Sequence, residues 1–417
     1  MPRISRVRRR RFAFLAGASA AALMLAGCSG ANDHDKGPSG LPTASTSGAA
    51  GAPTATAQAT AAGTATAPAT AAPPTSARAT AVAAYLDKHW PSGAGGAIAT
   101  ARNGELVSCQ GRGRANIEAR VDAGCDTVFD IGSITKSFTA AAILKLETTG
   151  ALRVTEPIGT YLGPVPADKR GITVHHLLTH TSGLPEGLGD DYDPVSRDDM
   201  LARALAAPLD SAPGKTFGYS NVGYSLLAAI LEKASGTSYS EFLTRNLFTP
   251  AGMTRTGYRL ADPRRDDIAV EYDADGHAHG IPLDHPWAPD GPYWNLRGNG
   301  GLLSTARDMY RWYRALDGES ILPAAAKAKM FSPHVPEGPD TPQSYGYGWS
   351  VLPSASGPIA THDGGNDWSY ARFLIRPADR TMVFWVSNHV AREGKWNLEE
   401  QDRELSLDLL ALTATTT

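Results

Sequence analysis

The feature that most restricts the fold of this chain is a long segment with very few apolar side chains. Residues 29–78 consist almost entirely of Ala, Thr, Ser, Gly and Pro, and no charged residue occurs from Gly37 to Ala77. Such a segment cannot bury enough apolar surface to offset the entropy lost on ordering. We therefore predict a disordered linker over 28–78 and one folded unit over 79–417, which is long enough for a large core.

The residues before this linker are typical of an export signal. Residues 1–27 contain arginines but no acidic residue, and an apolar run from Phe12 to Gly27 follows them. That run is short for a membrane span and suits a signal peptide. Its end, Leu25-Ala26-Gly27-Cys28, resembles the bacterial lipobox, in which the cysteine is lipidated. The arginines also loosely resemble a twin-arginine signal, and an incidental Cys28 behind a plain cleaved signal is the alternative.

From this signal we predict a protein outside the cytoplasm, anchored to the cell membrane through a lipid on Cys28, or secreted. The body of the chain is more acidic than its formal net charge of −3, because the signal holds six arginines. An acidic body argues against nucleic acid as a partner. The two remaining cysteines, Cys109 and Cys125, suggest one disulfide in an oxidising compartment, with two free thiols as the alternative.

Periodicity along the rest of the chain predicts an α+β fold. Strands are expected at both ends, around an Asn103-Gly104 turn and near the C-terminus, with helical patterns between them. Both ends of the chain would then build one antiparallel sheet flanked by helices, with a mostly helical lobe inserted over about 155–340. The expected segments are helices over 79–90, 222–234 and 397–412, and strands over 95–102, 106–111, 345–352, 370–375 and 381–387.

Three short motifs carry residues that could do chemistry. Ser133 stands at the start of a predicted helix that ends near Gly150, with Lys136 three residues on and on the same face. A cation in the first turn of a helix opposes the macrodipole, which points to a functional role. A serine hydroxyl becomes a good nucleophile when a neighbouring base takes its proton, and a lysine amine can be that base or tune it.

The other two motifs lie further along the chain. Tyr219-Ser220-Asn221 precedes a predicted helix, and a similar Tyr293-Trp294-Asn295 is given less weight because no helix follows it. His362-Asp363-Gly364-Gly365 comes after an extended stretch, where glycine allows the backbone to approach a ligand and a free N–H to bind an oxyanion.

In this order the motifs resemble the penicillin-recognising serine hydrolases, which include class C β-lactamases, D-Ala-D-Ala carboxypeptidases and related esterases. The resemblance implies a catalytic nucleophile in Ser133, with Lys136 and Tyr219 as its proton-transfer partners. It also implies substrate contacts at Asn221, His362 and Gly364, and an oxyanion hole made by the backbone N–H groups of Ser133 and Gly365. Neither a cofactor nor a metal is implied. A close Lys136 ammonium is expected to lower the pKa of Tyr219 from about 10 toward 7, and which of the two is the resting base stays open.

The sequence departs from the family pattern at His362, where lysine is common. His180, which with His176 has the spacing of a metal pair, is expected to satisfy backbone near the cleft instead. We therefore predict an exported serine hydrolase that acts on D-Ala-D-Ala-type peptides or small acyl esters and amides. The alternatives are a lipoprotein that binds penicillin or cell-wall peptide without efficient turnover, and a class C-like β-lactamase.

Overall fold

The computed structural model describes residues 76–261 and 264–414. The predicted signal peptide, Cys28 and nearly all of the predicted linker lie outside these residues. The linker was predicted to extend to residue 78, but helix α1 (Ala77–His89) begins inside that range because Ser76 caps it, accepting a hydrogen bond from the Ala79 N–H at 3.2 Å. Within the described residues, no helix combines the length and apolar character needed to cross a membrane.

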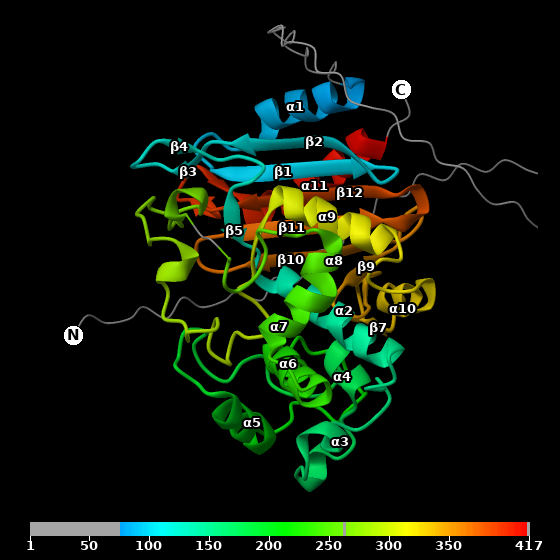
Figure 1. Cartoon of the computed structure of the whole chain (residues 1–417). Coiled ribbons are helices and arrows are strands. Elements are labelled where there is room, and N and C mark those ends of the chain that lie inside the picture. Colours follow the sequence, from blue (N-terminus) through cyan, green and yellow to red (C-terminus); the bar gives the residue numbers. More distant parts are fainter. Residues whose placement is uncertain (1–75, 262–263, 415–417) are drawn as a thin grey trace, which may run out of the picture. The chain divides into compact units, whose positions relative to one another are not determined.

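The fold is built on one antiparallel sheet to which both ends of the folded unit contribute, as predicted (Figure 1). The N-terminal hairpin pairs with a C-terminal strand over seven residue pairs, from Gly96 opposite Ser387 to Arg102 opposite Thr381. The eight strands of the sheet lie in the order β2 (Glu105–Arg112), β1 (Gly96–Arg102), β12 (Thr381–Ser387), β11 (Tyr370–Arg376), β10 (Ile359–Gly365), β9 (Ser350–Leu352), β8 (Ser344–Tyr345) and β7 (Val335–Pro336).

Helices cover both faces of this sheet (Figure 1), and its strands β1, β11 and β12 are buried on both sides. Side chains such as Val383 and Trp385 of β12 pack toward α1 and the C-terminal helix α11 (Leu398–Ala414). Their neighbours Phe384 and Val386 point the other way and join the larger core. Because successive side chains on a strand face opposite sides, the same alternation decides which residues of β10 reach the functional site.

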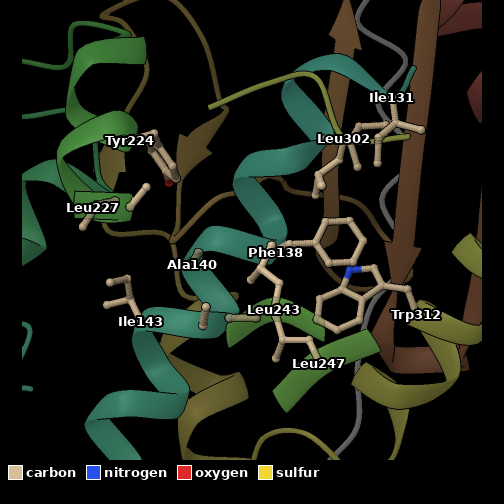
Figure 2. Packing of buried hydrophobic residues seen from close by; sticks show 14 of the residues in the cluster. Ile131, Phe138, Ala140, Ile143, Tyr224, Leu227, Leu243, Leu247, Leu302 and Trp312 are labelled. Atoms are coloured by element: carbon tan, nitrogen blue, oxygen red, sulfur yellow. The ribbon is translucent and has the colours of Figure 1, made fainter. Parts of the chain in front are cut away.

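The larger core surrounds helix α2 (Thr135–Thr148), which is buried along most of its length. Figure 2 shows Phe138 of α2 stacked against Trp312, with ring centroids 4.4 Å apart. The remaining helices are α3 (Gly159–Leu162), α4 (Val174–Leu178), α5 (Arg197–Ala206), α6 (Asn221–Ser235), α7 (Tyr239–Leu243), α8 (Thr249–Ala251), α9 (Ala306–Asp317) and α10 (Ala324–Met330). The predicted helix over 222–234 is therefore present as α6, and Gly236 ends it in the left-handed conformation with φ of 70°.

Short strand pairs complete the fold. They are β3 (Arg114–Asn116) with β4 (Val121–Asp122), β5 (Val128–Asp130) with β6 (Leu303–Thr305), and β13 (Ala391–Arg392) with β14 (Trp396–Asn397). Cys109 of β2 and Cys125, just before β5, form a disulfide whose Cα atoms are 5.6 Å apart.

Three details differ from the sequence predictions. The strand expected over 345–352 is a hairpin of β8 and β9, because the Gly346 N–H bonds to the Trp349 carbonyl at 2.7 Å and Gly348 has φ of +73°. Much of the region between α8 and β6 is irregular or 3-10 backbone rather than helix. Finally, His362 and the two glycines after it lie within strand β10 itself rather than after a strand.

Candidate active site

Ser133 lies where β5 gives way to α2. The chain leaves β5 at Asp130, turns through a 3-10 segment at Gly132–Ile134 and enters α2 at Thr135. Gly132 has φ of +49°, and a Cβ at this position would lie 2.5 Å from the Gly365 nitrogen. Only glycine fits there, since a side chain would be strained and would push β10 away from the turn that holds Ser133.

Lys136 points back along α2 to the Ser133 hydroxyl. Its Nζ lies 3.0 Å from Ser133 Oγ and 2.7 Å from the carbonyl oxygen of Asn299. The lysine side chain is fully buried, and this burial lowers its pKa to about 7, although nearby acidic groups, Asp191 first, act in the opposite direction. Near neutral pH a substantial fraction of Lys136 is therefore an uncharged amine that can accept a proton.

Tyr219 completes this group from the segment before α6. Lys136 Nζ lies 4.8 Å from the centre of the Tyr219 ring, and the Tyr219 hydroxyl is hydrogen-bonded to the side chain of Ser133. Burial raises the pKa of Tyr219 well above 10, which contradicts the expectation that Lys136 would lower it toward 7. Desolvation of the phenolate outweighs the opposing effect of the hydrogen bond with Ser133, and nearby acidic groups act in the same direction as desolvation, so Tyr219 is a neutral phenol at pH 7.

The His180 ring packs against this tyrosine, with ring centroids 4.4 Å apart and the ring planes tilted by 33°. Its Nδ1 accepts a hydrogen bond from the Ser220 N–H at 3.0 Å, so it satisfies backbone next to the site, as expected. His176, its proposed alternative metal partner, uses its own Nδ1 to accept the Thr173 N–H at 3.2 Å. The two histidines thus serve different backbone groups.

His362 faces the same side of the sheet as the larger core. Its Nε2 accepts a hydrogen bond from the Tyr345 hydroxyl at 3.0 Å, and its Nδ1 lies 2.5 Å from the carbonyl oxygen of Asp363, to which it donates. Burial lowers the pKa of His362 to about 4, so the ring is neutral at pH 7. The Asp363 side chain points to the opposite face and pairs with Arg372 at 3.3 Å.

The end of β10 lies directly against the turn that holds Ser133. A Cβ on Gly364 would lie 2.2 Å from the Ile131 carbonyl oxygen and 2.6 Å from the Ser133 nitrogen. This close approach brings the two backbone groups predicted for the oxyanion hole, the N–H of Ser133 and the N–H of Gly365, to one place. Asn221, also predicted here, is the first residue of α6, and its Oδ1 is buried without a hydrogen-bond partner.

A buried group of carboxyls around Asp130, three residues before Ser133, was not predicted. Asp130 accepts a hydrogen bond from the Gly132 N–H at 2.7 Å, and Asn366 Nδ2 reaches both Asp130, at 3.4 Å, and Glu271, at 2.9 Å. Glu271 also bonds to His285 Nε2 at 2.8 Å. Burial and the nearby Glu271 raise the pKa of Asp130 to about 7. Asp130 adjoins the Ser133 motif, but nothing in the sequence indicates that Glu271 would meet it.

A serine beside a buried lysine and a tyrosine, placed between helices and strand β10 of an antiparallel sheet, is typical of the class of β-lactamase/transpeptidase-like proteins. The family model described as Beta-lactamase matches residues 50–405. Penicillin-binding protein 4* of Bacillus subtilis is 32% identical over 314 residues, which are 70% of this chain and 68% of that protein. The chain belongs to the β-lactamase family.

Further comparisons agree with this assignment. The putative penicillin-binding protein PbpX of Bacillus subtilis is 32% identical over 263 residues, and the match covers 63% of each protein. The octameric penicillin-binding protein homologue from Pyrococcus abyssi is similar with a TM-score of 0.66 and 27% identity, over 79% of this chain and 77% of that one. The β-lactamase/D-alanine carboxypeptidase from Pseudomonas syringae has a TM-score of 0.69 at 19% identity, over 81% of this chain and 99% of that one, and shows the shared fold.

Proposed function

We propose that this protein is an exported serine hydrolase that works through an acyl-enzyme on Ser133. Its substrates would be small acyl esters and amides, or D-Ala-D-Ala-type peptides. The observation that carries the proposal is the 3.0 Å contact between Ser133 Oγ and a buried Lys136 whose pKa is lowered to about 7. A base with a pKa near the working pH combines the right protonation state with useful proton affinity.

Each proton transfer in the proposed reaction has a donor and an acceptor at the site. Neutral Lys136 accepts the Ser133 proton while Oγ attacks the substrate carbonyl, and the N–H groups of Ser133 and Gly365 bind the oxyanion that forms. Tyr219, hydrogen-bonded to Ser133, gives its proton to the leaving alcohol or amine as the carbonyl reforms, and regains a proton from Lys136. Water then attacks the acyl-enzyme, the same groups remove its proton, and Ser133 leaves with a proton restored.

The neutral His362 bears on the choice of substrate. A lysine there would offer a full charge to a substrate carboxylate, whereas His362 is uncharged and uses both ring nitrogens within the protein. Loss of one charge-assisted hydrogen bond to the substrate lowers kcat/KM by about 10- to 150-fold. We therefore expect β-lactams, which carry a carboxylate, to be poorer substrates than short acyl esters.

One experiment tests the hydrolase proposal. kcat/KM is measured at pH 7 for a short-chain nitrophenyl ester, a D-Ala-D-Ala peptide and a chromogenic cephalosporin, with wild type and with Ser133→Ala. We expect ester hydrolysis that is lost in Ser133→Ala. Absence of ester and peptide hydrolysis would contradict the proposal, and a cephalosporin value well above both others would favour a β-lactamase.

The second candidate is a protein acylated by penicillin without turnover. The two B. subtilis relatives, which are named as a penicillin-binding protein and a putative one, favour it. A fluorescent penicillin that forms a stable adduct on Ser133, with no ester turnover, would support this candidate over the hydrolase.

Membrane anchoring through a lipid on Cys28 is also proposed, and its support is the lipobox-like sequence at Leu25–Cys28. Metabolic labelling with a fatty-acid analogue should mark the wild type and not Cys28→Ala. Labelling that persists in Cys28→Ala would show that the anchor is absent or elsewhere.

A further inference from the structure

A narrow pocket opens beside the candidate active site, on the side of Asn221. Its walls come from the loop after α4, from the start of α6 and from the segment around Trp294. It has room for little more than one water-sized group. The carboxylate, amide and hydroxyl side chains in its wall belong to Asp191, Asn221, Ser225 and Asn295.

The polar groups of this pocket include buried oxygens that lack a donor. Asn295 is 9% exposed, and its Nδ2 donates to the Asp190 carbonyl at 2.7 Å, which fixes the orientation of its amide. Its Oδ1 is buried without a hydrogen-bond partner, and so is Oδ1 of Asn221. A buried acceptor without a donor is costly to leave unsatisfied, so both oxygens favour a group that brings hydrogens.

The charge around the pocket has one sign. Asp191 lines it, and among the described residues of its wall there is no lysine, arginine or histidine. The Asp191 carboxylate also acts on Lys136, for which it is the foremost of the charges that favour the ammonium form. The pocket is therefore within electrostatic reach of Ser133. A water-sized group that has several donors and a positive charge fits this lining, and an ammonium has these properties.

We propose that this pocket receives the free amino group of the substrate, so that amino-acid esters and amides are preferred over their N-acylated counterparts. The inference rests on the proposed hydrolase function and narrows its substrate class. An α-ammonium is two bonds from the scissile carbonyl, and Asn221 in the pocket wall directly follows the segment that brings the Tyr219 ring to Lys136.

The test compares alanine p-nitroanilides of both configurations with their N-acetyl counterparts, and uses nitrophenyl acetate as a neutral reference. The variants are Asp191→Asn and, as a matched control, Asp198→Asn, an exposed acid on α5 that is not part of this pocket. We expect the wild type to prefer a free-amine substrate. Asp191→Asn should lower kcat/KM for that substrate about 3- to 10-fold, because the contribution of an exposed carboxylate lies between that of a surface ion pair and that of a buried charged hydrogen bond.

Asp198→Asn should leave kcat/KM for the neutral reference unchanged, and Asp191→Asn should change it by about 2-fold or less at pH 7, the effect of a small decrease in the pKa of Lys136. A wild type that prefers N-acetyl substrates, that hydrolyses only the neutral ester, or that loses activity on all substrates in Asp191→Asn would overturn the amine pocket. None of these results would count against the hydrolase itself. That proposal fails on a different result, namely neutral-ester hydrolysis that is absent or that survives in Ser133→Ala.

Discussion

Two buried ionisable groups lie three residues before and three residues after Ser133, and burial shifts their pKa values in opposite directions. Lys136, on α2, has its pKa lowered to about 7, whereas Asp130, at the end of β5, has its pKa raised to about 7. In both cases desolvation disfavours the charged form, so a base becomes weaker and an acid becomes weaker too. Two groups of opposite chemistry thus change charge in the same pH range.

The two groups differ in their hydrogen-bond partners. Lys136 contacts Ser133 Oγ and the Asn299 carbonyl, so its amine can exchange a proton with a nucleophile. Asp130 instead accepts a hydrogen bond from the Gly132 N–H and another from Asn366, which also donates to Glu271. These bonds connect the turn before Ser133 to the residue that follows Gly365. Lys136 thus contacts the side chain of Ser133, whereas Asp130 and Asn366 hold the turn before Ser133 against the end of β10.

The largest effect is expected on the lysine side. Lys136→Ala, Tyr219→Phe and the double variant should each lower kcat/KM for a neutral ester by about 10³-fold or more, to similar residual rates, because residues that act as one unit are not additive. Asp130→Asn keeps an acceptor for the Gly132 N–H and should lose far less. If the double variant's loss equals the product of the two single losses, Lys136 and Tyr219 do not act as one unit.

The next effect concerns stability and has opposite signs for the two groups. Folded Lys136 binds fewer protons than unfolded lysine between about pH 7 and its usual pKa, so its contribution to stability rises with pH across that window. Folded Asp130 binds more protons than unfolded aspartate from about pH 4 to 7, so its contribution falls as pH rises there. Together they destabilise the fold most near pH 7.

Urea unfolding between pH 4 and 10 checks this. Lys136→Met should be more stable than wild type near pH 7 by several kcal/mol, at about 1.4 kcal/mol per pKa unit, and the gain should shrink as pH rises. The free energy of unfolding of Asp130→Asn should increase relative to that of the wild type as pH rises from about 4 to 7. A Lys136→Met variant less stable than wild type at pH 7 would mean that its lost hydrogen bonds outweigh the desolvation of the lysine.

A third prediction uses a feature far from both groups. Cys109 and Cys125 are 16 positions apart, and in the chain-entropy model a loop of this size contributes about 3 kcal/mol to stability. Replacing both cysteines with serine should lower the free energy of unfolding by a similar amount at every pH. If the loss varied strongly with pH between 4 and 10, the pH dependence would not belong to Lys136 and Asp130 alone.

Much of this arrangement could be predicted from the sequence, and the exceptions have a common cause. The sheet built from both ends, the helix after Ser133 and the helix after Tyr219 follow from local periodicity and from glycine signals. The carboxyl group of Glu271 beside Asp130 depends on a contact between residues far apart in sequence. The high pKa of Tyr219 also depends on how completely the folded chain excludes water, which no local pattern encodes.

The same limit explains the incorrect strand over 345–352. Its aromatic residues alternate as a strand requires, but Gly348 adopts φ of +73° and the chain folds back as a hairpin. Conversely, the opposite orientations of His362 and Asp363 follow directly from strand alternation and could be anticipated.

The smallest expected effect is a shift in the pH profile of kcat/KM. It distinguishes control of activity by Lys136 from control by Asp130. kcat/KM for a neutral ester should fall as pH decreases through about 7, because protonated Lys136 cannot accept the Ser133 proton. Asp130 changes charge in the same range, so the position of this limb alone does not identify its source. In Asp130→Asn the limb should persist, since the lysine is retained.

Asp191→Asn should shift this fall in kcat/KM along the pH axis if the protonation of Lys136 causes it. The Asp191 carboxylate favours the Lys136 ammonium, so its removal lowers the lysine pKa and shifts the limb to lower pH, by about half a unit or less for an exposed charge. Asp198→Asn, on α5, should leave it in place. Because Asp191 also raises the pKa of Asp130, the shift has to be seen again in an Asp130→Asn background. A limb that disappears in Asp130→Asn would transfer control of activity from the lysine to the carboxyl side of Ser133.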